Sequence, residues 1–585
     1  MDVNILTLYK AGIIDDLDLH FSRFILQKEK RDLTASGLHV IEIATALISR
    51  SIAAGNICLS EKDLEAVKAE CGPSGEFLPS WSDICTLFKD APWCSDGKLV
   101  RPVVFDGERF YLYRYWNYES KLAGMVKMMS SQPGMFNSKA DEAADLASGM
   151  FRDSASYGLQ MKAVTGVFSR RFNVITGGPG TGKTTVIARI ISIIWKLFPG
   201  TVVRLAAPTG KAAARINEAL SSSAQQMKDI VDADILEKLN GLSGSSIHRL
   251  LGWMSGKTVF RHNSDEPLDA DILIVDEASM VDLAMMSLLL EAVKPGASVI
   301  LIGDKDQLAS VEAGNVLGDI FRAASEGYIE RDAVTEFIES YRFRKGTGIG
   351  ELAMSIREGL PAERLEAIAA DHGSEVRYLS SINEKAAKKI VKWYENVMQC
   401  SDRDEAFDAF EKFRILCATR NGRNGVEEVN RYVEKMLGIK GIIKEDGVWY
   451  GGRPVMVLEN NYELELYNGD CGLIFDVSGE KRAFFRRGKG VFRTFPVAVL
   501  PKVETVYAMT VHKSQGSEYD SVMIVFPQKD VPLLTKELLY TAVTRAKTEI
   551  TLIAGIELLL TASGRSAVRS SGLVSALKRM EEKKN

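Results

Sequence analysis

Residues 177–184 read GGPGTGKT, a spacing of glycine, lysine and threonine that suits the binding of a phosphate chain. The glycines let backbone N–H groups close around a β-phosphate, Lys183 can reach the β- and γ-phosphates, and the Thr184 hydroxyl can bind Mg²⁺. An apolar strand pattern precedes the motif and an apolar helical pattern follows it, so a chance turn is a poor alternative. The predicted nucleotide contacts are Gly178, Pro179, Gly180, Thr181, Gly182, Lys183, Thr184 and Thr185.

Acidic and amide side chains follow two later strand patterns. Asp276 and Glu277 end DILIVDE, where Asp276 can complete the Mg²⁺ shell and Glu277 can activate water as a base. Alone, such a pair is usually a helix cap, but beside a phosphate loop the catalytic interpretation is better. Gln307 in GDKDQLAS can orient water or sense a γ-phosphate, although by itself it would be an ordinary surface residue.

Two segments between these strands place hydroxyl and basic residues beside a strand end or helix start. They are LAAPTGKAAARINEA (205–219) and SSIHRLLG (245–252), and such groups can hold nucleic-acid phosphates. The candidates are Pro208, Thr209, Lys211, Ser246, His248 and Arg249. For Lys211, His248 and Arg249 taken singly, a solvated surface or a helix cap is an equally good interpretation.

The elements that must position these residues form a repeated strand–helix pattern. Residues 140–330, and again 331–439 with 503–585, alternate apolar strands with helices, which predicts two parallel sheets covered by helices. Residues 440–502 have short strands and an Asn-Gly turn signal, and predict a small inserted β-barrel. Residues 1–125 are mainly helical and form a separate amino-terminal domain, so the predicted class is α/β.

Three segments have two interpretations each. The aromatic run RFYLYRYWNYESKLA (109–123) fits a core edge or partner contact better than a nucleic-acid platform. WMSGKTVFRHNSDEPL (253–268) fits a short inserted hairpin or a plain surface loop equally well. The basic run KRAFFRRGKGVFRTF (481–495) can line a DNA path or can simply be exposed hairpin charge.

Composition sets loose limits on function. The chain has 585 residues, 46% hydrophobic and 26% charged, which is ordinary for a globular protein of several domains. A net charge of −4 argues only weakly against DNA, because a local basic groove can lie within an acidic total. The seven cysteines have no CxxC pairing and predict reduced thiols. With no export signal or membrane span in the pattern, we expect a cytoplasmic protein.

In this order and at this spacing the motifs resemble those of superfamily 1 helicases. Within that superfamily, SIHRLLG, DEASMVDL, IGDKDQLASVEAGNVLGDI, MTVHKSQGSEYDSV and ELLYTAVTRAK most resemble the RecD family of the RecBCD helicase–nuclease (exodeoxyribonuclease V). The resemblance covers residues 100–560 and implies two RecA-like domains, an SH3-like inserted barrel and a partner-binding amino-terminal domain. The long extra amino-terminal region of stand-alone RecD-like helicases is not expected.

The resemblance also assigns further site residues. It implies that Gln160 reads adenine, that Arg342 in SYRF and Arg545 in TAVTRAK reach the γ-phosphate, and that residues 510–518 form a loop shared by both ligands. In that loop Thr510, His512 and Ser514 would face DNA, whereas Gly516 and Glu518 would face the nucleotide. Arginine suits the γ-phosphate role because its planar fork stays charged, and such residues contribute about 10³ to 10⁵ in rate.

The expected activity is that of an ATP- and Mg²⁺-dependent 5′-to-3′ DNA helicase in double-strand-break repair and recombination. The expected partners are single-stranded and duplex-end DNA together with RecB-like and RecC-like subunits. Two alternatives stay open, a stand-alone superfamily 1 helicase and a regulatory subunit whose ATP cycle is a switch with negligible unwinding. No nuclease constellation is found, so a nuclease activity would belong to another subunit.

Overall fold

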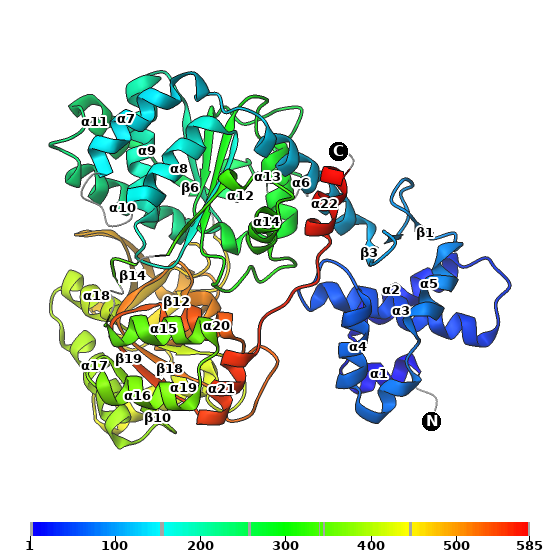
Figure 1. Cartoon of the computed structure of the whole chain (residues 1–585). Coiled ribbons are helices and arrows are strands. Elements are labelled where there is room, and N and C mark those ends of the chain that lie inside the picture. Colours follow the sequence, from blue (N-terminus) through cyan, green and yellow to red (C-terminus); the bar gives the residue numbers. More distant parts are fainter. Residues whose placement is uncertain are drawn as a thin grey trace.

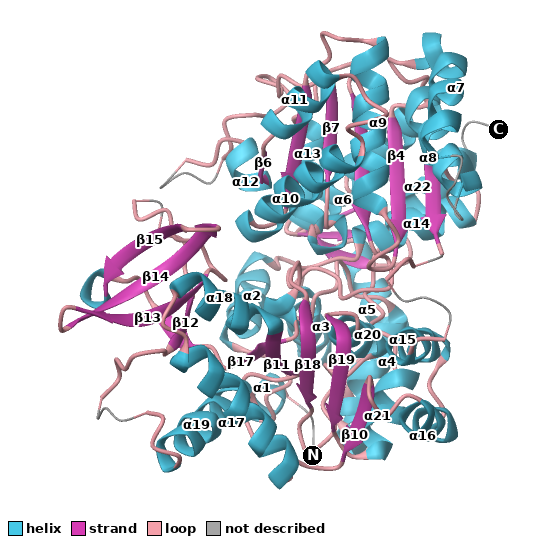
Figure 2. Ribbon diagram, turned by 90° about the vertical axis from the view of Figure 1, so that its left-hand side faces the viewer, coloured by secondary structure: helices cyan, strands magenta, loops and turns pink. Residues whose placement is uncertain are grey.

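The computed structural model describes residues 4–151, 157–254, 259–338, 340–342, 346–443, 447–461 and 463–582. It contains two α/β lobes, an antiparallel sheet inserted in the second lobe, and an amino-terminal domain beside them (Figure 1). Figure 2 shows the parallel strands of the two lobes and the inserted sheet projecting to one side. Among the described residues no helix is both long enough and apolar enough to cross a membrane.

The amino-terminal domain is a helical bundle against a small sheet. Its elements are α1 (Ile5–Lys10), α2 (Asp16–Lys28), α3 (Ala35–Ala53), α4 (Glu61–Glu70), α5 (Trp81–Lys89), β1 (Cys94–Ser95), β2 (Val103–Phe105) and β3 (Phe110–Leu112). Capping boxes at Asp15 and Ser60 start α2 and α4, because each side chain binds the N–H group three residues ahead. Phe110 and Tyr111 are buried, which confirms that the start of the aromatic run is a core edge.

The first lobe is built on a six-stranded parallel sheet of order β6-β5-β7-β8-β4-β9. Its strands are β4 (Phe172–Gly177), β5 (Val203–Ala207), β6 (Gly244–Ser246), β7 (Ile272–Val275), β8 (Ser298–Gly303) and β9 (Val334–Phe337). Its helices are α6 (Tyr113–Ser131), α7 (Ala140–Phe151), α8 (Tyr157–Ser169), α9 (Lys183–Leu197), α10 (Gly210–Gln226), α11 (Ala233–Gly241), α12 (Ile247–Leu250), α13 (Leu283–Glu291) and α14 (Val316–Ser325). The central strands β4, β7 and β8 are buried at every position, as expected for a sheet covered on both faces.

The second lobe repeats this architecture with a five-stranded parallel sheet of order β10-β19-β18-β11-β17. Its strands are β10 (Val376–Leu379), β11 (Phe413–Cys417), β17 (Ala508–Thr510), β18 (Tyr519–Val525) and β19 (Ala546–Ile553). Its helices are α15 (Gly348–Glu358), α16 (Ala362–Asp371), α17 (Glu384–Gln399), α18 (Arg403–Lys412), α19 (Val426–Ile439), α20 (Lys536–Val543) and α21 (Ile556–Gly564). The predicted α/β class with two parallel-sheet lobes is therefore confirmed.

The insertion forms a five-stranded antiparallel sheet of order β15-β14-β13-β12-β16. Its strands are β12 (Pro454–Val457), β13 (Cys471–Val477), β14 (Glu480–Gly488), β15 (Val491–Pro496) and β16 (Val503–Thr505). Two hydrogen bonds fix its base to α19, because Tyr450 Oη donates to Glu434 Oε1 at 2.7 Å and Thr505 Oγ1 donates to the same oxygen at 3.3 Å.

Four elements lie outside the sequence ranges predicted for their units. Most of α6 lies within residues 1–125, the predicted amino-terminal domain, yet it packs on α13 of the first lobe. β9 extends the first sheet by pairing with β4, although the second unit is predicted from residue 331. β16 pairs with β12, so the insertion continues past its predicted end at 502. The last helix, α22 (Leu573–Glu582), packs on α6 and α14 of the first lobe rather than on the second lobe. The sequence cannot show which sheet a short apolar strand joins, because tertiary packing decides it.

A buried carboxylate fastens the carboxyl-terminal segment to α6. Glu119 Oε2 accepts hydrogen bonds from Ser571 Oγ at 2.9 Å and from the Gly572 N–H at 2.9 Å. A side chain at Gly572 would meet the Tyr111 hydroxyl at 2.0 Å, so the segment lies directly against α6 and β3. Burial raises the pKa of Glu119 from 4.5 to about 7, although these two hydrogen bonds act in the opposite direction.

We predict that Glu119→Gln flattens the dependence of stability on pH between about 4.5 and 7. The folded-state pKa lies above the unfolded value, so the contribution of Glu119 is complete below pH 4.5 and is lost as pH rises to 7. Glutamine keeps the hydrogen-bond acceptor without the charge. The free energy of unfolding of the variant, relative to that of wild type, should therefore rise by up to about 3 kcal/mol between pH 5 and pH 8. Urea titrations of both proteins at these two pH values measure this difference.

The exposed Glu142→Gln on α7 serves as the control and should leave the pH dependence unchanged. An identical pH dependence for Glu119→Gln and wild type would show that Glu119 does not titrate with folding.

Candidate functional site

The topology of the first sheet gathers the predicted nucleotide residues along one edge. Four neighbouring parallel strands, β7, β8, β4 and β9, all end there. Their carboxyl ends lead into Asp276 and Glu277, the loop 304–308, the loop 178–182 and residues 340–342 in turn. Because parallel strands end at a common edge, segments up to 160 residues apart in sequence form one site.

The phosphate loop has the backbone shape needed to surround an anion. Gly180 and Gly182 have positive φ angles of 74° and 82°, which turn successive N–H groups toward the start of α9. The Lys183 ammonium donates hydrogen bonds to the carbonyl oxygens of Gly177 at 2.6 Å and Gly178 at 2.9 Å. The cation therefore lies inside the curve of the loop, where a phosphate chain would meet it.

Of two carboxylates at this edge, Asp304 is fully buried and Asp276 is half-buried. Asp276 Oδ1 accepts a hydrogen bond from the Glu277 N–H at 2.8 Å, and burial together with the Glu277 charge raises the pKa of Asp276. Glu277 itself adopts a left-handed backbone conformation with φ of 51°, an uncommon geometry for a non-glycine residue. Burial also raises the pKa of Asp304. Lys183 opposes both shifts, so its charge lies close to both carboxylates.

The donor set fits a divalent cation held partly by a phosphate chain. No cluster of three or more metal-ligating His, Cys, Asp or Glu side chains occurs in the parts of the chain that the structure describes. Hard cations such as Mg²⁺ commonly use one or two carboxylates and complete their shell with phosphate oxygens and water. Asp276, whose pKa responds to the charge of Lys183 at the start of α9, suits that pattern.

A buried polar network joins the site to the second lobe. Arg545, which immediately precedes β19, donates from Nη2 to Gln307 Oε1 at 2.9 Å. Gln307 Nε2 donates to Asp304 Oδ2 at 3.0 Å, and the Tyr540 hydroxyl donates to the same oxygen at 3.2 Å. Glu549, which lies four residues after Arg545 in the sequence, pairs with Arg377 at 2.9 Å and Lys389 at 2.7 Å.

Arg342 also contacts the second lobe. Its Nη1 lies 2.7 Å from Glu518 Oε1, so the γ-phosphate candidate and the nucleotide-facing end of the loop 510–518 form an ion pair. Burial acts to raise the pKa of Glu518, but Arg342 holds it below its usual value. Gly516 lies against Ala212 of α10, since an added Cβ would approach that methyl group to 3.7 Å. The predicted shared loop thus contacts the first lobe through both Gly516 and Glu518.

Sequence reasoning missed Tyr341, the residue directly before Arg342. Its N–H donates to the Gly180 carbonyl at 2.9 Å, and its hydroxyl lies 3.5 Å from Gln160 Nε2. The ring is 46% exposed and lies over Gly182, where it can stack on a base. Gln160 is buried and its Oε1 atom has no hydrogen-bond partner among the described residues, so this acceptor is available to a base amine. The aromatic residue beside the motif arginine was the available signal.

Three polar residues of the second lobe were also missed. Thr541 Oγ1 accepts from the Leu308 N–H at 2.9 Å, and Gln515 Nε2 donates to the Leu308 carbonyl at 3.0 Å. Tyr540, besides its bond to Asp304, would meet a Cβ added at Gly178 at 2.8 Å. Their types carry no distinct signal in the sequence, because only the apposition of the lobes gives them partners.

The predicted DNA residues of the first lobe lie on the adjacent half of the same sheet edge. They follow β5 and β6, which pair with each other. Thr209 Oγ1 accepts from the Ala212 N–H at 3.2 Å and starts α10, while Ser246 Oγ accepts from the Arg249 N–H at 3.3 Å and starts α12. His248 and Arg249 are exposed, and Pro208 and Lys211 are partly exposed. This set is therefore open to a strand of nucleic acid.

The predicted DNA residues of the second lobe differ from one another in solvent exposure. Thr510 and His512 are partly exposed, and burial together with the charge of Arg569 lowers the pKa of His512. Ser514 is fully buried and its hydroxyl donates to the Val511 carbonyl at 2.6 Å. Direct contact between Ser514 and DNA does not fit this geometry; the side chain instead braces the turn that presents His512.

The two segments with open interpretations, 481–495 and 253–268, contact different parts of the molecule. In the run 481–495 the aromatic side chains of Phe484 and Phe485 are buried, and Arg486 pairs with Asp408 and Glu411 of α18. Much of that run therefore belongs to the sheet and its attachment to α18. An antiparallel bridge joins Trp253 to Phe260 in the segment 253–268, whose residues 255–258 lie outside the described ranges.

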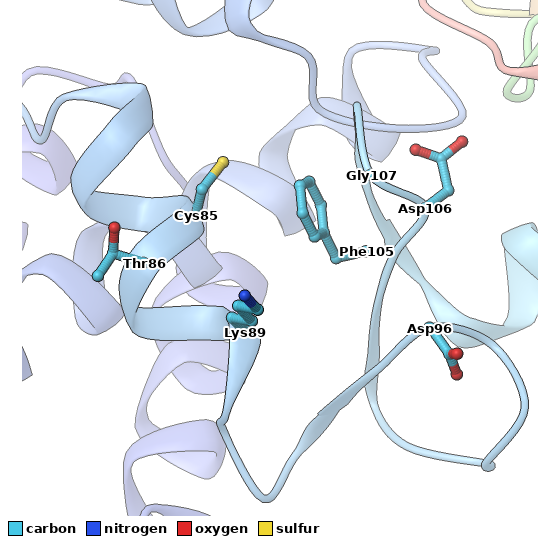
Figure 3. Close-up of a pocket in the computed structure, with 7 residues that line it drawn as sticks. All are labelled: Cys85, Thr86, Lys89, Asp96, Phe105, Asp106 and Gly107. Carbon is cyan, nitrogen blue, oxygen red and sulfur yellow. The ribbon is translucent and has the colours of Figure 1, made fainter.

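The amino-terminal domain has a hollow whose polar side chains are not arranged around a common point, unlike those of the nucleotide site. It lies between α5 and the loops around β2, and Figure 3 shows that its polar side chains do not converge on one point. Its lining residues are Cys85, Thr86, Lys89, Asp96, Phe105, Asp106 and Gly107. We assign no chemistry to it.

Three protein families match segments of the chain. The AAA domain family matches residues 160–313, the UvrD-like helicase C-terminal domain matches residues 505–553, and the N-terminal domain of RecBCD enzyme subunit RecD matches residues 10–111. The first two matches contain the loops assembled above.

Similar proteins extend over most of the sequence. The RecBCD enzyme subunit RecD of Mycolicibacterium smegmatis is 36% identical over 97% of this chain and 98% of its own length. The protein of the same name from Haemophilus influenzae is 32% identical over 81% of each chain. The ATP-dependent RecD2 DNA helicase of Deinococcus radiodurans is 31% identical over 75% of this chain and 54% of its own length.

We predict that Arg545→Lys and Arg545→Ala both lower nucleoside triphosphate hydrolysis by about 10³-fold. A lysine ammonium cannot reproduce the planar fork that reaches Gln307 Oε1, the Ser517 carbonyl and the Thr541 carbonyl together. Steady-state turnover, measured beside nucleoside diphosphate affinity, checks this, and affinity should change little.

The control is Arg377→Lys, since Arg377 pairs with Glu549 on the far side of the same sheet. A near-normal rate for Arg545→Lys would exclude the guanidinium from the reacting site.

Proposed function

This chain belongs to the RecD family, and from that premise we propose that it is the ATP-driven 5′-to-3′ helicase subunit of a RecBCD-type helicase–nuclease acting in double-strand-break repair and recombination. The family follows from a relative 36% identical over 97% of the chain. The match of a RecD N-terminal domain to residues 10–111 favours a complex subunit over a stand-alone helicase. RecB-like and RecC-like subunits are its protein partners, and single-stranded and duplex-end DNA its substrates, in the cytoplasm.

ATP and Mg²⁺ fit the site at the edge of the first sheet. The loop 178–185 would surround the phosphates and Lys183 would neutralise the β- and γ-phosphate charge. Thr184 and Asp276 would hold Mg²⁺, which would supply further charge neutralisation. Glu277 accepts the proton of the attacking water. Gln160 and Tyr341 hold the base by hydrogen bonding and stacking.

Hydrolysis is linked to movement through the interface between the lobes. Gln307 senses the γ-phosphate from the first lobe, while Arg342 and Arg545 stabilise the charge that develops on it. DNA lies across Thr209, Lys211, His248 and Arg249 on the first lobe and Thr510 and His512 on the second. When the lobes close and open around ATP, the two sets of contacts alternate in strength and advance the chain along one strand.

One observation carries this proposal above a simple ATPase that works within one lobe. The buried hydrogen bond between Arg545 Nη2 and Gln307 Oε1, at 2.9 Å, connects residues 238 positions apart and belonging to different lobes. An ATP-driven motor needs such a contact, because the state of the nucleotide in one lobe must change the position of the other.

We predict that Lys183→Gln abolishes ATP hydrolysis and DNA unwinding while the fold remains intact. The change removes the cation at the phosphates but leaves the loop, whose shape depends on backbone geometry. ATPase assays with and without oligo(dT), a forked-duplex unwinding assay and a melting curve measure the three quantities. Lys196→Gln at the other end of α9 is the control and should be active. An active Lys183→Gln enzyme would refute the ATP site.

Simultaneous His248→Ala and Arg249→Ala substitutions should weaken binding of single-stranded DNA and leave the basal ATPase rate unchanged. Both side chains are exposed beside β6 and away from the phosphate loop. Loss of one phosphate contact should reduce the slope of log K against log salt by about 0.7. Fluorescence anisotropy at several salt concentrations measures this slope. Lys228→Ala, which removes one exposed charge just after α10, is the control. Equal slopes for the double variant and wild type would show that His248 and Arg249 do not contact DNA.

A further inference from the structure

The carboxyl-terminal segment passes from the second lobe to the first within a few residues. On the second lobe, Arg565 pairs with Asp530 at 2.5 Å, and the Ala567 N–H donates to Glu537 Oε2 at 2.8 Å. Val568 is 79% exposed at the crossing. Figure 1 shows the red segment between α21 and α22 running along this path.

Immediately after the crossing the segment is fixed to the amino-terminal domain and the first lobe. The Ser570 carbonyl accepts from the Ile57 N–H at 2.7 Å, and Ser570 Oγ donates to Asp63 Oδ1 at 2.7 Å. Ser571 and Gly572 then bind Glu119 of α6. Only Val568 therefore lies between the attachments on the two sides, because Ala567 is bound to the second lobe and Arg569 to the first.

Arg569 uses its guanidinium to hold one loop of the first lobe. Its Nη1 donates to the carbonyl oxygens of Glu312 at 2.6 Å and Gly314 at 2.9 Å, and lies 3.5 Å from Ser310 Oγ. Its Nη2 donates to the Ser310 carbonyl at 2.6 Å. Each of these acceptors is neutral, and all come from three alternate residues of the same loop. A planar fork with several donors suits such a set better than a single ammonium group.

The loop held by Arg569 begins at the nucleotide site. Gln307 at its start binds Arg545, and Leu308 binds Thr541 and Gln515 through its backbone. Residues 310–314 form its far end, so residues of the second lobe and the carboxyl-terminal segment hold it along its whole length. A loop held at both ends transmits a displacement from one end to the other, whereas a loop held at one end relaxes.

Arg569 also lies where two other parts of the molecule meet that loop. Its guanidinium carbon would be 3.1 Å from a Cβ added at Gly55, and the Gly55 carbonyl accepts from the Gly314 N–H at 3.0 Å. The DNA-facing loop of the second lobe binds the same first-lobe loop, because the Gln515 N–H donates to the His512 carbonyl at 3.1 Å and Gln515 Nε2 donates to the Leu308 carbonyl at 3.0 Å. The charge of Arg569 in addition lowers the pKa of His512. The loop 307–314 thus connects a DNA-binding candidate to the nucleotide site.

We propose that Arg569 is a positioning residue for DNA-stimulated ATP turnover, which it serves by holding residues 310–314 so that strand binding near His512 reaches Gln307. The inference rests on the proposed helicase function and adds a residue outside the helicase motifs. Arg569 touches neither nucleotide nor DNA in this role. Its loss should therefore separate DNA stimulation from basal hydrolysis.

The experiment compares Arg569→Ala, Arg569→Lys and wild type in the full chain. Basal ATP turnover and ADP affinity should stay within about twofold of wild type, whereas maximal turnover with saturating oligo(dT) should fall about tenfold for alanine. Lysine, which keeps the charge and some donors, should give an intermediate stimulation. Arg565→Ala is the matched control, because its bonds remain within the second lobe and stimulation should be unchanged.

The outcomes distinguish a failure of the proposed helicase function from a failure of the role given to Arg569. A wild-type chain that oligo(dT) does not stimulate would overturn the proposed function and this inference together. Normal stimulation of Arg569→Ala beside a stimulated wild type would overturn the inference alone. An equal fall of basal and stimulated rates in both Arg569 variants would show a merely structural residue and also overturn it. If Arg569→Ala does not fold, Arg569→Lys decides by the same criteria.

Discussion

The burial of the Arg545 guanidinium between the lobes is the constraint on which the site depends. Taking a cation out of water costs several kcal/mol unless charge and hydrogen bonds compensate. Here the donors find the neutral oxygens of Gln307, Ser517 and Thr541, and burial lowers the pKa of Arg545 while the charges of Glu277 and Glu518 oppose that shift. A triphosphate would add negative charge to a place where a buried cation is incompletely neutralised. Nucleotide binding and contact between the lobes therefore favour each other.

The sheet topology explains why that contact can also reach DNA. In the first lobe one sheet edge carries the nucleotide loops on β7, β8, β4 and β9 and the DNA candidates on β5 and β6. In the second lobe Glu518 and Arg545 precede the neighbouring strands β18 and β19, and the Tyr519 N–H binds the Arg545 carbonyl at 2.9 Å. The two ligand sites are thus neighbouring parts of one rigid framework rather than separate sites linked by a flexible chain.

Much of this arrangement could be predicted from the sequence, and the exceptions have a common cause. The α/β class, the phosphate loop and the acid pair follow from local patterns, because an apolar strand, a glycine-rich turn and a helix start are neighbours in sequence. The partners of Arg342 and Arg545 could not be predicted, since Glu518 and Gln307 are supplied by the opposite lobe. The family resemblance implied that Ser514 faces DNA, yet the turn buries it. The same limit applied to β9 and α22, whose apolar residues do not identify the surface they pack against.

The crossing at Val568 has a geometrical consequence. The polypeptide joins the two lobes between β9 and α15 and again at this residue, so the lobes are connected at two points rather than one. Two bodies joined at two points turn easily only about the line through both, as a door turns on two hinges. Sliding apart or twisting would require either connection to stretch, and consecutive Cα atoms cannot separate beyond about 3.8 Å. The displacement of any bound group during such a swing grows with its distance from that line, so atoms close to Val568 move little while those far from both hinges sweep the longest arc.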